Sequence, residues 1–568
     1  MEQKCKIGAQ QAAEARRTLE KYRQGKRALE QRIIEDDKWY RLRHWDAAGR
    51  HSRNPGDEPA SAWLFNSLLN KHGDMMDNFP SPAVLPREPS DRSDAQALSA
   101  ILPVILERSR FEEAYSRNAY PKLQHGTACY GVFWDNSLEH GRGDIRVTDV
   151  DPLSLFWEPG VSDIQDSRNL FVVSMVEDEV LAASYPGKKL HAPMTLADYQ
   201  RDDPAGQDGR SAVIDWYYKR PATGGGMLVH YCKFVGDTVL YASENDPLLC
   251  EKGFYDHGKY PFVLDILFPV RGSAAGFGFV DVMKSPQMYI DELDRMLLRN
   301  ARLAGKPRWF VRDACGVNEE EFADWERDFV HVAGRMEADD LRQVEVKPLP
   351  AFIANHRQMK VQELKETSGN RDFAQGGTTS GVTAASAIAA LQEAGNKLSR
   401  DLIKGSYRAF SEVCYLIIEL IRQFYDEERA FRITGENGGA FIRYSNAQLR
   451  GGGREPVFDI VVKAQKSNPF SQLSQNEQAK ELYRLGFFRP ELAEQALGAL
   501  ELMQFEGIEG VRAWIAGNAQ RLRERQERQQ ALEIAAQQAQ AAQANAIRAP
   551  RQPLTAAEKL VPKEGRHD

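Results

Sequence analysis

The order of helix-forming and helix-breaking residues over 281–426 predicts a projecting helical hairpin. A helical segment ends at Gly305-Lys306-Pro307, where glycine and proline stop helices, and a short mixed segment follows. A second helical segment of similar length begins near residue 352. A hairpin of this kind makes few contacts in an isolated subunit. In a ring of several copies, such hairpins would pack side by side as a tube.

The ends of these segments give further expectations. Ser285-Pro286 predicts the start of the first helix, with serine as the cap and proline in the first turn. Residues 369–381 form a loop rich in glycine and small polar residues, and a long helix is expected over 383–426. Because structureless loops inside compact domains are usually short, this loop is better explained by a function than by a plain linker, which is the alternative.

Upstream of the hairpin the pattern changes along the chain. Helices are expected over 9–45, 62–78 and 91–119, with a proline-rich turn at Pro80–Pro89 between the last two. A mostly β region over 121–270 follows, inserted in this helical frame, so the predicted fold class is α+β. Its expected strands are 126–135, 144–150, 153–157, 170–175, 212–218, 227–234, 238–242 and 262–268.

The C-terminal part returns to short strands and then to helices. The segment 518–547 is a good helix former with almost no apolar face, so alone it would be a marginal helix. Residues 548–568 have the composition of a disordered tail. The other expected elements are strands at 430–434, 440–444 and 457–463, and helices at 470–484, 490–502 and 508–516.

Composition argues against several classes of protein. The net charge of −7 disfavours a sequence-reading DNA binder, because phosphate neutralisation supplies most of the affinity of such proteins. An acidic surface suits a conduit instead, since strong phosphate contacts would impede sliding. The longest apolar run, near Val413–Ile421, is too short to span a bilayer and predicts a buried helix. The six cysteines form no CxxC pair and the N-terminus has no apolar signal segment, which favours a reducing cytoplasm.

The sequence motifs of common enzymes are missing. The chain contains no GxxxxGK(S/T), GxGxxG, GxSxG or HExxH. Gly276-Phe277-Gly278-Phe279 matches half of a dinucleotide fingerprint, and a turn explains it better. The histidines between 44 and 72 match no zinc spacing, and Asp151-Pro152 fits a strand-to-turn role better than cation binding. We therefore predict no catalytic residue, no metal and no cofactor, although acids brought together by folding stay open.

Two stretches resemble portal proteins of tailed bacteriophages. Residues 150–168, with Asp151-Pro152, Glu158-Pro159 and Asp163-Ile164 followed by Asp166 and Arg168, are similar to the family's "DP…F.DP…DI.D.R" segment. Glu158 stands where aspartate is common. The second stretch is the order of helix, Lys306-Pro307, small module, helix, loop and long helix. It is similar to the family's stem, clip, stem, tunnel loop and wing helix. The resemblance covers most of 60–470 and is architectural more than a strict motif.

This resemblance implies a homo-oligomeric ring, typically of twelve subunits, that forms the channel for double-stranded DNA at one capsid vertex. Such a ring serves genome packaging and ejection and passes DNA without reading its sequence. The implied partners are the terminase large subunit, later the head–tail adaptor proteins, and the capsid and scaffolding proteins. The protein would reside in the virion, and in the host cytoplasm during assembly. It would have no active site of its own.

The resemblance also implies a division into domains, each a segment of the chain. These are a wing over 1–280, stem helices over 281–305 and 351–368, a clip over 306–350, a tunnel loop over 369–381 and a wing return over 382–465. After the part that the resemblance covers, we expect a helical crown over 466–517, a helical barrel over 518–547 and a disordered tail over 548–568.

Candidate site residues follow from these assignments, and for each a solvated surface position is the alternative. Stem candidates, which would face the channel or pair with a neighbouring subunit, are Asp291, Glu292, Asp294, Arg295, Arg299, Arg302, Arg357, Lys360, Glu363 and Glu366. Tunnel-loop candidates for contact with DNA are Arg371, Asp372, Phe373, Gln375, Thr378 and Thr379. In the clip, a small core is expected from Trp309, Trp325 and Phe329, and exposed docking residues are Arg308, Arg312, Glu319, Glu320 and Asp324. In the barrel, candidates to meet packaged DNA are Arg521, Arg523, Arg525 and Arg528.

Two rival functions stay open at this point. Another virion connector or tail protein is disfavoured by the hairpin-plus-loop layout and by the length of the chain. A nucleic-acid enzyme with dispersed acidic metal ligands would be indicated by metal-dependent DNA cleavage. The mass of the purified protein separates such an enzyme from both kinds of ring protein.

Overall fold

The computed structural model describes residues 6–51, 55–188, 190–201, 206, 208–222, 225–305, 309–313, 316–324, 328–335, 337, 340–343, 347–369, 397–433, 440–450, 456–465, 479–501 and 508–548. Contacts within the chain divide it into two units, Met1–Lys466 and Ser467–Asp568, and each is described by itself. Both helices and strands are present, as the predicted α+β class requires. No helix among these residues is long and apolar enough to cross a membrane.

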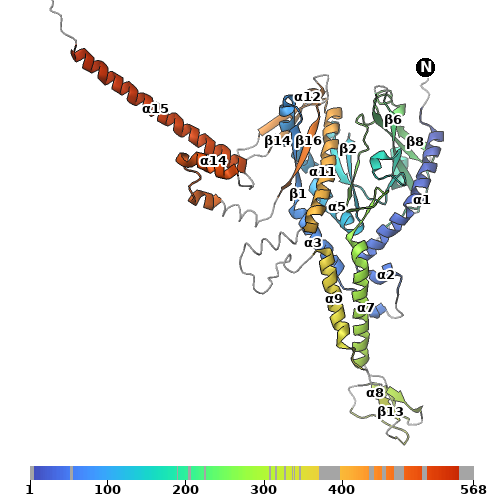
Figure 1. Ribbon diagram of the computed structural model, residues 1–568. Helices are drawn as coiled ribbons and strands as arrows, with labels where there is room; N and C mark the ends of the chain where they lie inside the picture. The colour runs from blue at the N-terminus through green and yellow to red at the C-terminus, as the bar shows by residue number, and fades with distance from the viewer. Residues whose placement is uncertain are drawn as a thin grey trace, which may run out of the picture. The chain divides into compact units, whose positions relative to one another are not determined.

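Two small antiparallel sheets organise the body of the first unit (Figure 1). Their strands lie where the sequence predicted strands over 121–270. The five-stranded sheet has the order β4 (Leu155–Trp157), β5 (Asn169–Glu177), β6 (Arg210–Pro221), β7 (Met227–Val235) and β8 (Thr238–Ala242). The three-stranded sheet has the order β3 (Asp144–Asp149), β2 (Thr127–Asp135) and β9 (Phe262–Ile266). Beside them lie α6 (Asp178–Ser184) and the short pair β10 (Phe268–Pro269) and β11 (Gly276–Phe277).

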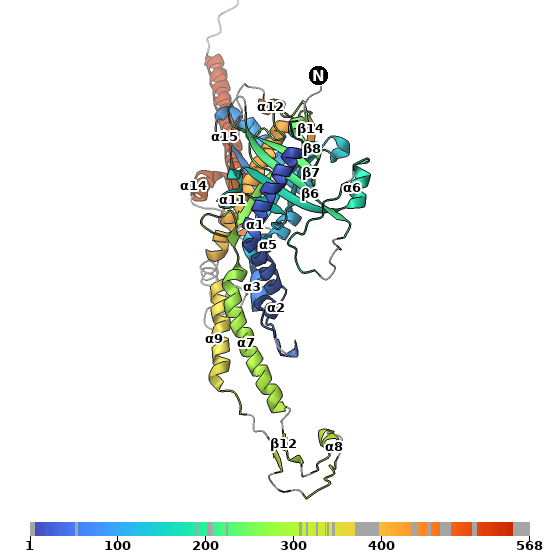
Figure 2. The same cartoon turned by 90° about the vertical axis from the view of Figure 1, so that its right-hand side faces the viewer.

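Helix α1 (Ala9–Tyr40) packs on the five-stranded sheet (Figure 2). Its buried residues Ala12, Ala15, Leu19 and Tyr22 recur at intervals of three or four, which places them on one face of the helix. They share an apolar core with strand residues such as Phe171, whose ring lies 5.8 Å from that of Tyr22. The helix α2 (His44–Ala48) follows after a short turn.

The single helix expected over 91–119 is in fact two helices, α4 (Arg92–Arg108) and α5 (Phe111–His125). Arg110 between them has a φ of 52°, a left-handed conformation that a continuous right-handed helix cannot contain. Helices α5 and α11 (Lys397–Phe424) both contact the three-stranded sheet. Val413 and Ile421 of α11 are fully buried, which confirms the buried helix predicted there. The part of the expected long helix before Lys397 lies outside the described residues.

The proline-rich turn expected at Pro80–Pro89 is wrong, because residues Phe79–Pro86 form strand β1. It pairs antiparallel with the distant strand β16 (Phe458–Gln465). The backbone N–H and C=O of Val84 both bond to the hydroxyl of Ser99, on the side away from β16. Pro80 and Pro82 have the same parity as Val84, so their missing N–H groups cost the strand pair no ladder hydrogen bond.

The predicted hairpin consists of α7 (Phe279–Gly305) and α9 (Ala351–Ser368), which run side by side in both views (Figures 1 and 2). The predicted start at Ser285-Pro286 is wrong, since α7 begins at Phe279 and contains Pro286. Pro286 is the eighth residue of α7, past its first turn, so this position donates no backbone hydrogen bond within the helix. Beyond the far end of the hairpin lies a small module with β12 (Trp309–Val311), α8 (Glu319–Ala323) and β13 (Leu341–Gln343), which we call the tip module.

The first unit is completed by strands β14 (Arg429–Ile433) and β15 (Ala440–Tyr444), which pair with each other, and by the short helix α12 (Ala447–Arg450). In the second unit, α14 (Ala493–Glu501) packs against the start of α15 (Ile508–Arg548). The break expected between helices 508–516 and 518–547 is wrong, because α15 is continuous through both. The predicted tail after residue 548 lies outside the described residues.

Candidate functional site in the helical hairpin

The two hairpin helices are held together by an ion pair in addition to apolar packing. The guanidinium of Arg357 on α9 donates to both carboxylate oxygens of Asp294 on α7, with 3.1 Å between Nη2 and Oδ2. Nearer the tip, the Asn300 amide donates to the backbone carbonyl of Lys347 over 3.0 Å. These contacts fix α9 against one side of α7.

The root of α7 is bonded to the segment before α3 (Trp63–Asp77). Asp291 is completely buried, so its predicted place on the surface of the hairpin is wrong. Its Oδ1 accepts hydrogen bonds from the backbone N–H and hydroxyl of Ser61, over 2.9 and 2.8 Å. It also accepts one from the Gln287 amide over 3.0 Å, and its Oδ2 lies 2.5 Å from His44 Nδ1. Sequence alone did not show this burial, because the partners come from a distant part of the chain.

A second side of α7 is lined by the segment that we call the brace, residues 44–51 and 55–61. Its contacts with α7 include ion pairs and a cation–aromatic contact, and they use α7 side chains spaced by three or four residues, which lie on one helix face. From root to tip these contacts are Arg50–Glu292 (2.5 Å), Arg295 over the Trp45 ring (4.4 Å to its centroid), Asp57–Arg299 (3.5 Å) and Asp57–Arg302.

The remaining side of α7 carries a row of large apolar side chains that we call the apolar stripe. Val282, Tyr289, Met296 and Leu303 follow one another at intervals of seven and are 38%, 55%, 48% and 39% exposed. Residues seven apart drift by only about 20° around a helix, so the four side chains form one row. The neighbouring helix α9 adds two apolar residues at the same interval, which are Phe352 and Met359, both 67% exposed. The spacing of seven is visible in the sequence, although the predicted stem residues include none of these apolar positions.

The charged residues predicted on α9 stay near the surface of the hairpin. Lys360 bonds to Glu363 over 2.7 Å and lies 5.7 Å from the centroid of the Tyr289 ring. Glu366 accepts a hydrogen bond from Gln362, and both it and Glu363 are exposed. The predicted loop residues Arg371, Asp372, Phe373, Gln375, Thr378 and Thr379 lie outside the described residues.

The tip module has little core of its own. Trp309 is 38% exposed and Phe329 is 79% exposed, so the prediction that they form a small core is wrong. Trp309 instead meets Phe322 edge to face, with 5.5 Å between the ring centroids. All three residues of β12 are exposed, in a sheet of only two strands. Trp325, the third residue of the predicted core, lies outside the described residues. Of the docking candidates, Arg308 also lies outside them, and Arg312, Glu319, Glu320 and Asp324 are exposed.

The segment with Asp151 has a structural role that the residues make clear. The Asp151 carboxylate accepts a hydrogen bond from the Leu153 backbone N–H over 2.9 Å, which shapes the turn. The Lys26 ammonium of α1 donates to the backbone carbonyls of Pro152, Leu153 and Leu155. Burial lowers the pKa of Lys26 to about 7. The motif therefore joins α1 to the edge of the five-stranded sheet.

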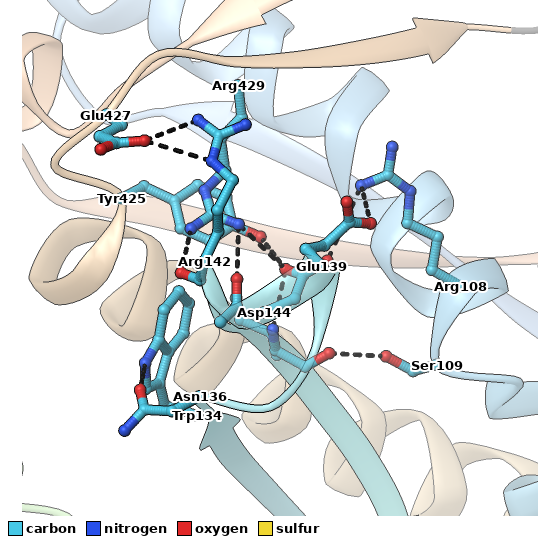
Figure 3. A network of polar contacts seen from close by, with 12 residues as sticks. Arg108, Ser109, Trp134, Asn136, Glu139, Arg142, Asp144, Tyr425, Glu427 and Arg429 are labelled. Atoms are coloured by element: carbon cyan, nitrogen blue, oxygen red, sulfur yellow. Dashed lines mark hydrogen bonds and ion pairs between the residues drawn. The ribbon is translucent and has the colours of Figure 1, made fainter.

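A polar network ties the end of α11 to the β2–β3 turn (Figure 3). The Tyr425 hydroxyl donates to the buried Asp144 carboxylate over 2.7 Å. Arg429 donates to the backbone carbonyls of Gly143 and Arg142, over 2.7 and 3.1 Å. The Trp134 ring stacks on a neighbouring ring of α11, that of Phe424, at 4.9 Å. Within the part of the chain that the structure describes, no group of three or more His, Cys, Asp and Glu side chains is arranged to hold a metal ion.

A braced helical hairpin with a tip module, carried by a mixed α/β body, is the layout of a structural connector of tailed bacteriophages. The chain belongs to the phage P22-like portal protein family, whose model matches residues 16–560. Portal proteins are structural components of the capsid vertex and form a non-enzymatic family. A search of curated proteins found no match for the chain.

Proposed function

We propose that this protein assembles into a homo-oligomeric ring of about a dozen subunits, the number typical of the family. The hairpins of the ring would surround a channel for double-stranded DNA. The apolar stripe of α7 is the observation that carries the proposal. One side of α7 is occupied by α9 and another by the brace, whereas the stripe leaves four large apolar side chains in contact with water. A neighbouring hairpin of a second copy supplies the apolar surface that this row lacks.

The stripe supplies part of the free energy of assembly. Complete burial of a large apolar side chain contributes about 1.5–3 kcal/mol, so side chains that are already half buried contribute roughly 1 kcal/mol each. Each ring interface would bury one stripe, and a closed ring leaves no stripe exposed at an end. Phe352 and Met359 of α9, at the same spacing, extend the surface available to the neighbour.

Packaging and ejection of the genome follow from the channel in this proposal. The net charge of −7 supports passive passage of DNA, because an acidic chain makes few of the phosphate contacts that would slow sliding. The exposed tip module, with Arg312, Glu319, Glu320 and Asp324 at its surface, would dock the terminase large subunit and later the head–tail adaptor proteins. The arginines of α15, Arg521, Arg523, Arg525 and Arg528, would face packaged DNA in a helical barrel.

The test is the mass and symmetry of the purified full chain, measured by light scattering and negative-stain images. We expect a ring with a central hole for the native chain. Tyr289→Glu with Met296→Glu would place charges in the stripe and shift the mass to monomers or small oligomers. Leu248→Glu, at an apolar residue that is 78% exposed and lies outside the hairpin, is the matched control and should still form rings. A compact native monomer that cleaves DNA would refute the proposal.

A further inference from the structure

Helix α3 receives its N-terminal caps from the hairpin. Leu64 in its first turn donates its backbone N–H to the side-chain oxygen of Gln287 over 3.0 Å. The Gln287 amide nitrogen donates to the Ser61 carbonyl over 2.8 Å, and Asp291 accepts from the Ser61 N–H. The first N–H groups of a helix have no partner within the helix, so Gln287 supplies one acceptor that α3 lacks, and Asp291 fixes Ser61 just before the helix. The Asp291 carboxylate also faces the positive end of the α3 dipole.

The same helix anchors the C-terminal end of α9. The Lys365 ammonium lies 5.5 Å from the centroid of the Trp63 ring, at the first residue of α3. One turn further along, the hydroxyls of Ser67 and Ser368 are 3.3 Å apart, and both residues are buried. Ser368 is the last residue of α9, so this contact holds the point where the chain leaves the hairpin.

The next turn of α3 anchors the start of α11. The Lys71 ammonium donates to the Ser399 hydroxyl over 2.8 Å, and that hydroxyl donates to the Asp74 carboxylate over 2.6 Å. Lys71 and Ser399 are both buried. Burial lowers the pKa of Lys71, and the nearby Asp74 carboxylate opposes that shift. Ser399 lies in the first turn of the described part of α11, so this contact holds that part of the helix against α3.

These anchors share one face of α3. Trp63, Ser67, Lys71 and Asp74 are spaced by four, four and three residues, which places them in one row along the helix. Ser67 and Lys71 are one helical turn apart. One turn of α3 therefore sets the separation of Ser368 and Ser399, the two sides of the chain that flank residues 370–396.

We propose that α3 is the positioning element that couples the hairpin helix α7 to both chain ends flanking residues 370–396. Because Gln287 and Asp291 hold the start of α3, a displacement of α7 moves α3, and the Ser67 and Lys71 contacts carry both ends with it. The use of this coupling in a DNA channel rests on the proposed function, whereas the coupling itself belongs to the single subunit.

The physical basis is that one regular helix carries all of these contacts. Leu64, Leu68 and Met75 pack on its other side in the main apolar core, which also contains Met283 and Ile290 of α7. The contacts with α7, α9 and α11 include hydrogen bonds between buried groups, so breaking one has a free-energy cost. A shift of a few tenths of an ångström at the α7 root is therefore transmitted more easily than it is absorbed by broken contacts.

Hydrogen exchange of backbone amides, followed by mass spectrometry on the purified full chain, tests this coupling. Ser67→Ala should speed exchange at residues 365–369 alone, and Lys71→Met should speed exchange at 401–405 alone. Gln287→Met, which removes the cap of α3 from the hairpin side, should speed exchange at both segments together. Loss of one buried hydrogen bond corresponds to a rise of about tenfold in exchange through local opening.

Asp294→Asn is the matched control, because Asp294 pairs with Arg357 within the hairpin and faces α9 rather than α3. It should leave both segments at the native rate. The coupling is refuted if Gln287→Met leaves both segments unchanged, or if Ser67→Ala alone speeds both. A uniform rise that includes β5–β7 in Gln287→Met also counts against it, since it would reflect general loss of stability. The oligomer mass of the same samples reports separately on the proposed ring, so failure of one does not imply failure of the other.

Discussion

Asp291 of α7 and His44 of α2 face each other across 2.5 Å with no exposed surface on either side chain. Asp291 also accepts three hydrogen bonds from Ser61 and Gln287, so its removal would leave several buried donors without an acceptor. We expect Asp291→Ala to lower the free energy of unfolding by roughly 3–5 kcal/mol. Chemical denaturation of the native and variant chains measures this loss.

Asp46→Ala provides the comparison for this prediction, because Asp46 is an exposed carboxylate of the same helix α2 and lies 3.5 Å from the exposed His51. Its stability should stay close to that of the native chain. If Asp291→Ala were as stable as Asp46→Ala, the buried anchor at the hairpin root would be disproved.

Asp36 gives the stability of the protein a specific dependence on pH. Burial raises the pKa of Asp36 to about 8, and Asp281 adds to the rise, while Lys284 and Arg32 oppose it. The folded state thus keeps this proton up to about pH 8, whereas the unfolded chain releases it near the ordinary pKa of 3.8. The stability contributed by the neutral carboxyl is complete below pH 4 and falls as the pH rises towards 8.

Asp36→Asn cannot ionise and should remove this dependence. The stability of the variant relative to the native chain should rise by roughly 3–4 kcal/mol between pH 5 and pH 8. Denaturation of both proteins at pH 5, 6.5 and 8 measures the change. A difference between the two chains that is constant with pH would contradict a neutral Asp36 in the folded state.

Strand β1 shows which features the sequence could and could not predict. Its pattern of Pro80, Pro82 and Pro86 is typical of a turn, and the strand exists only because β16 lies beside it, far away in the sequence. The hairpin, in contrast, was predictable because local glycine and proline signals mark where its helices end. The burial of Asp291 was not predictable, because it depends on the brace and on α3, whose positions relative to α7 only the folded chain defines.

The same strand yields a test of its pairing. Pro82→Ala should change stability little, because position 82 points its backbone away from β16. Ala83→Pro should cost about 3 kcal/mol or more, because position 83 has the opposite parity and contributes its N–H to the ladder with Val461. Thermal unfolding of the two variants compares neighbouring positions of one strand. Equal losses in both would show that the register is different.

The tip module provides a test of exposure. Phe329 is 79% exposed, so Phe329→Ser should leave the unfolding of the chain close to native, whereas a core phenylalanine would cost about 3–5 kcal/mol. Leu364→Ala, at a fully buried residue of α9, is the comparison and should be clearly destabilised. A large loss of stability in Phe329→Ser would contradict this exposure and favour the small core that the sequence predicted.

The network in Figure 3 allows the contribution of one buried hydrogen bond to be measured. Tyr425→Phe removes only the hydroxyl that donates to Asp144 over 2.7 Å, and should cost about 1–2 kcal/mol. Asp144→Asn keeps the shape but removes the charge that faces Arg108 and Arg429, at 3.7 and 3.9 Å, and should cost more. Because the two residues share a bond, the double variant should lose less than the sum of the single losses, with a coupling of about 1 kcal/mol.

Arg142→Ala, which breaks an exposed pair with Glu427, is the control and should have little effect by the same denaturation measurement. Strict additivity of Tyr425→Phe and Asp144→Asn would show that the end of α11 is held by ring stacking on Trp134 rather than by this hydrogen bond.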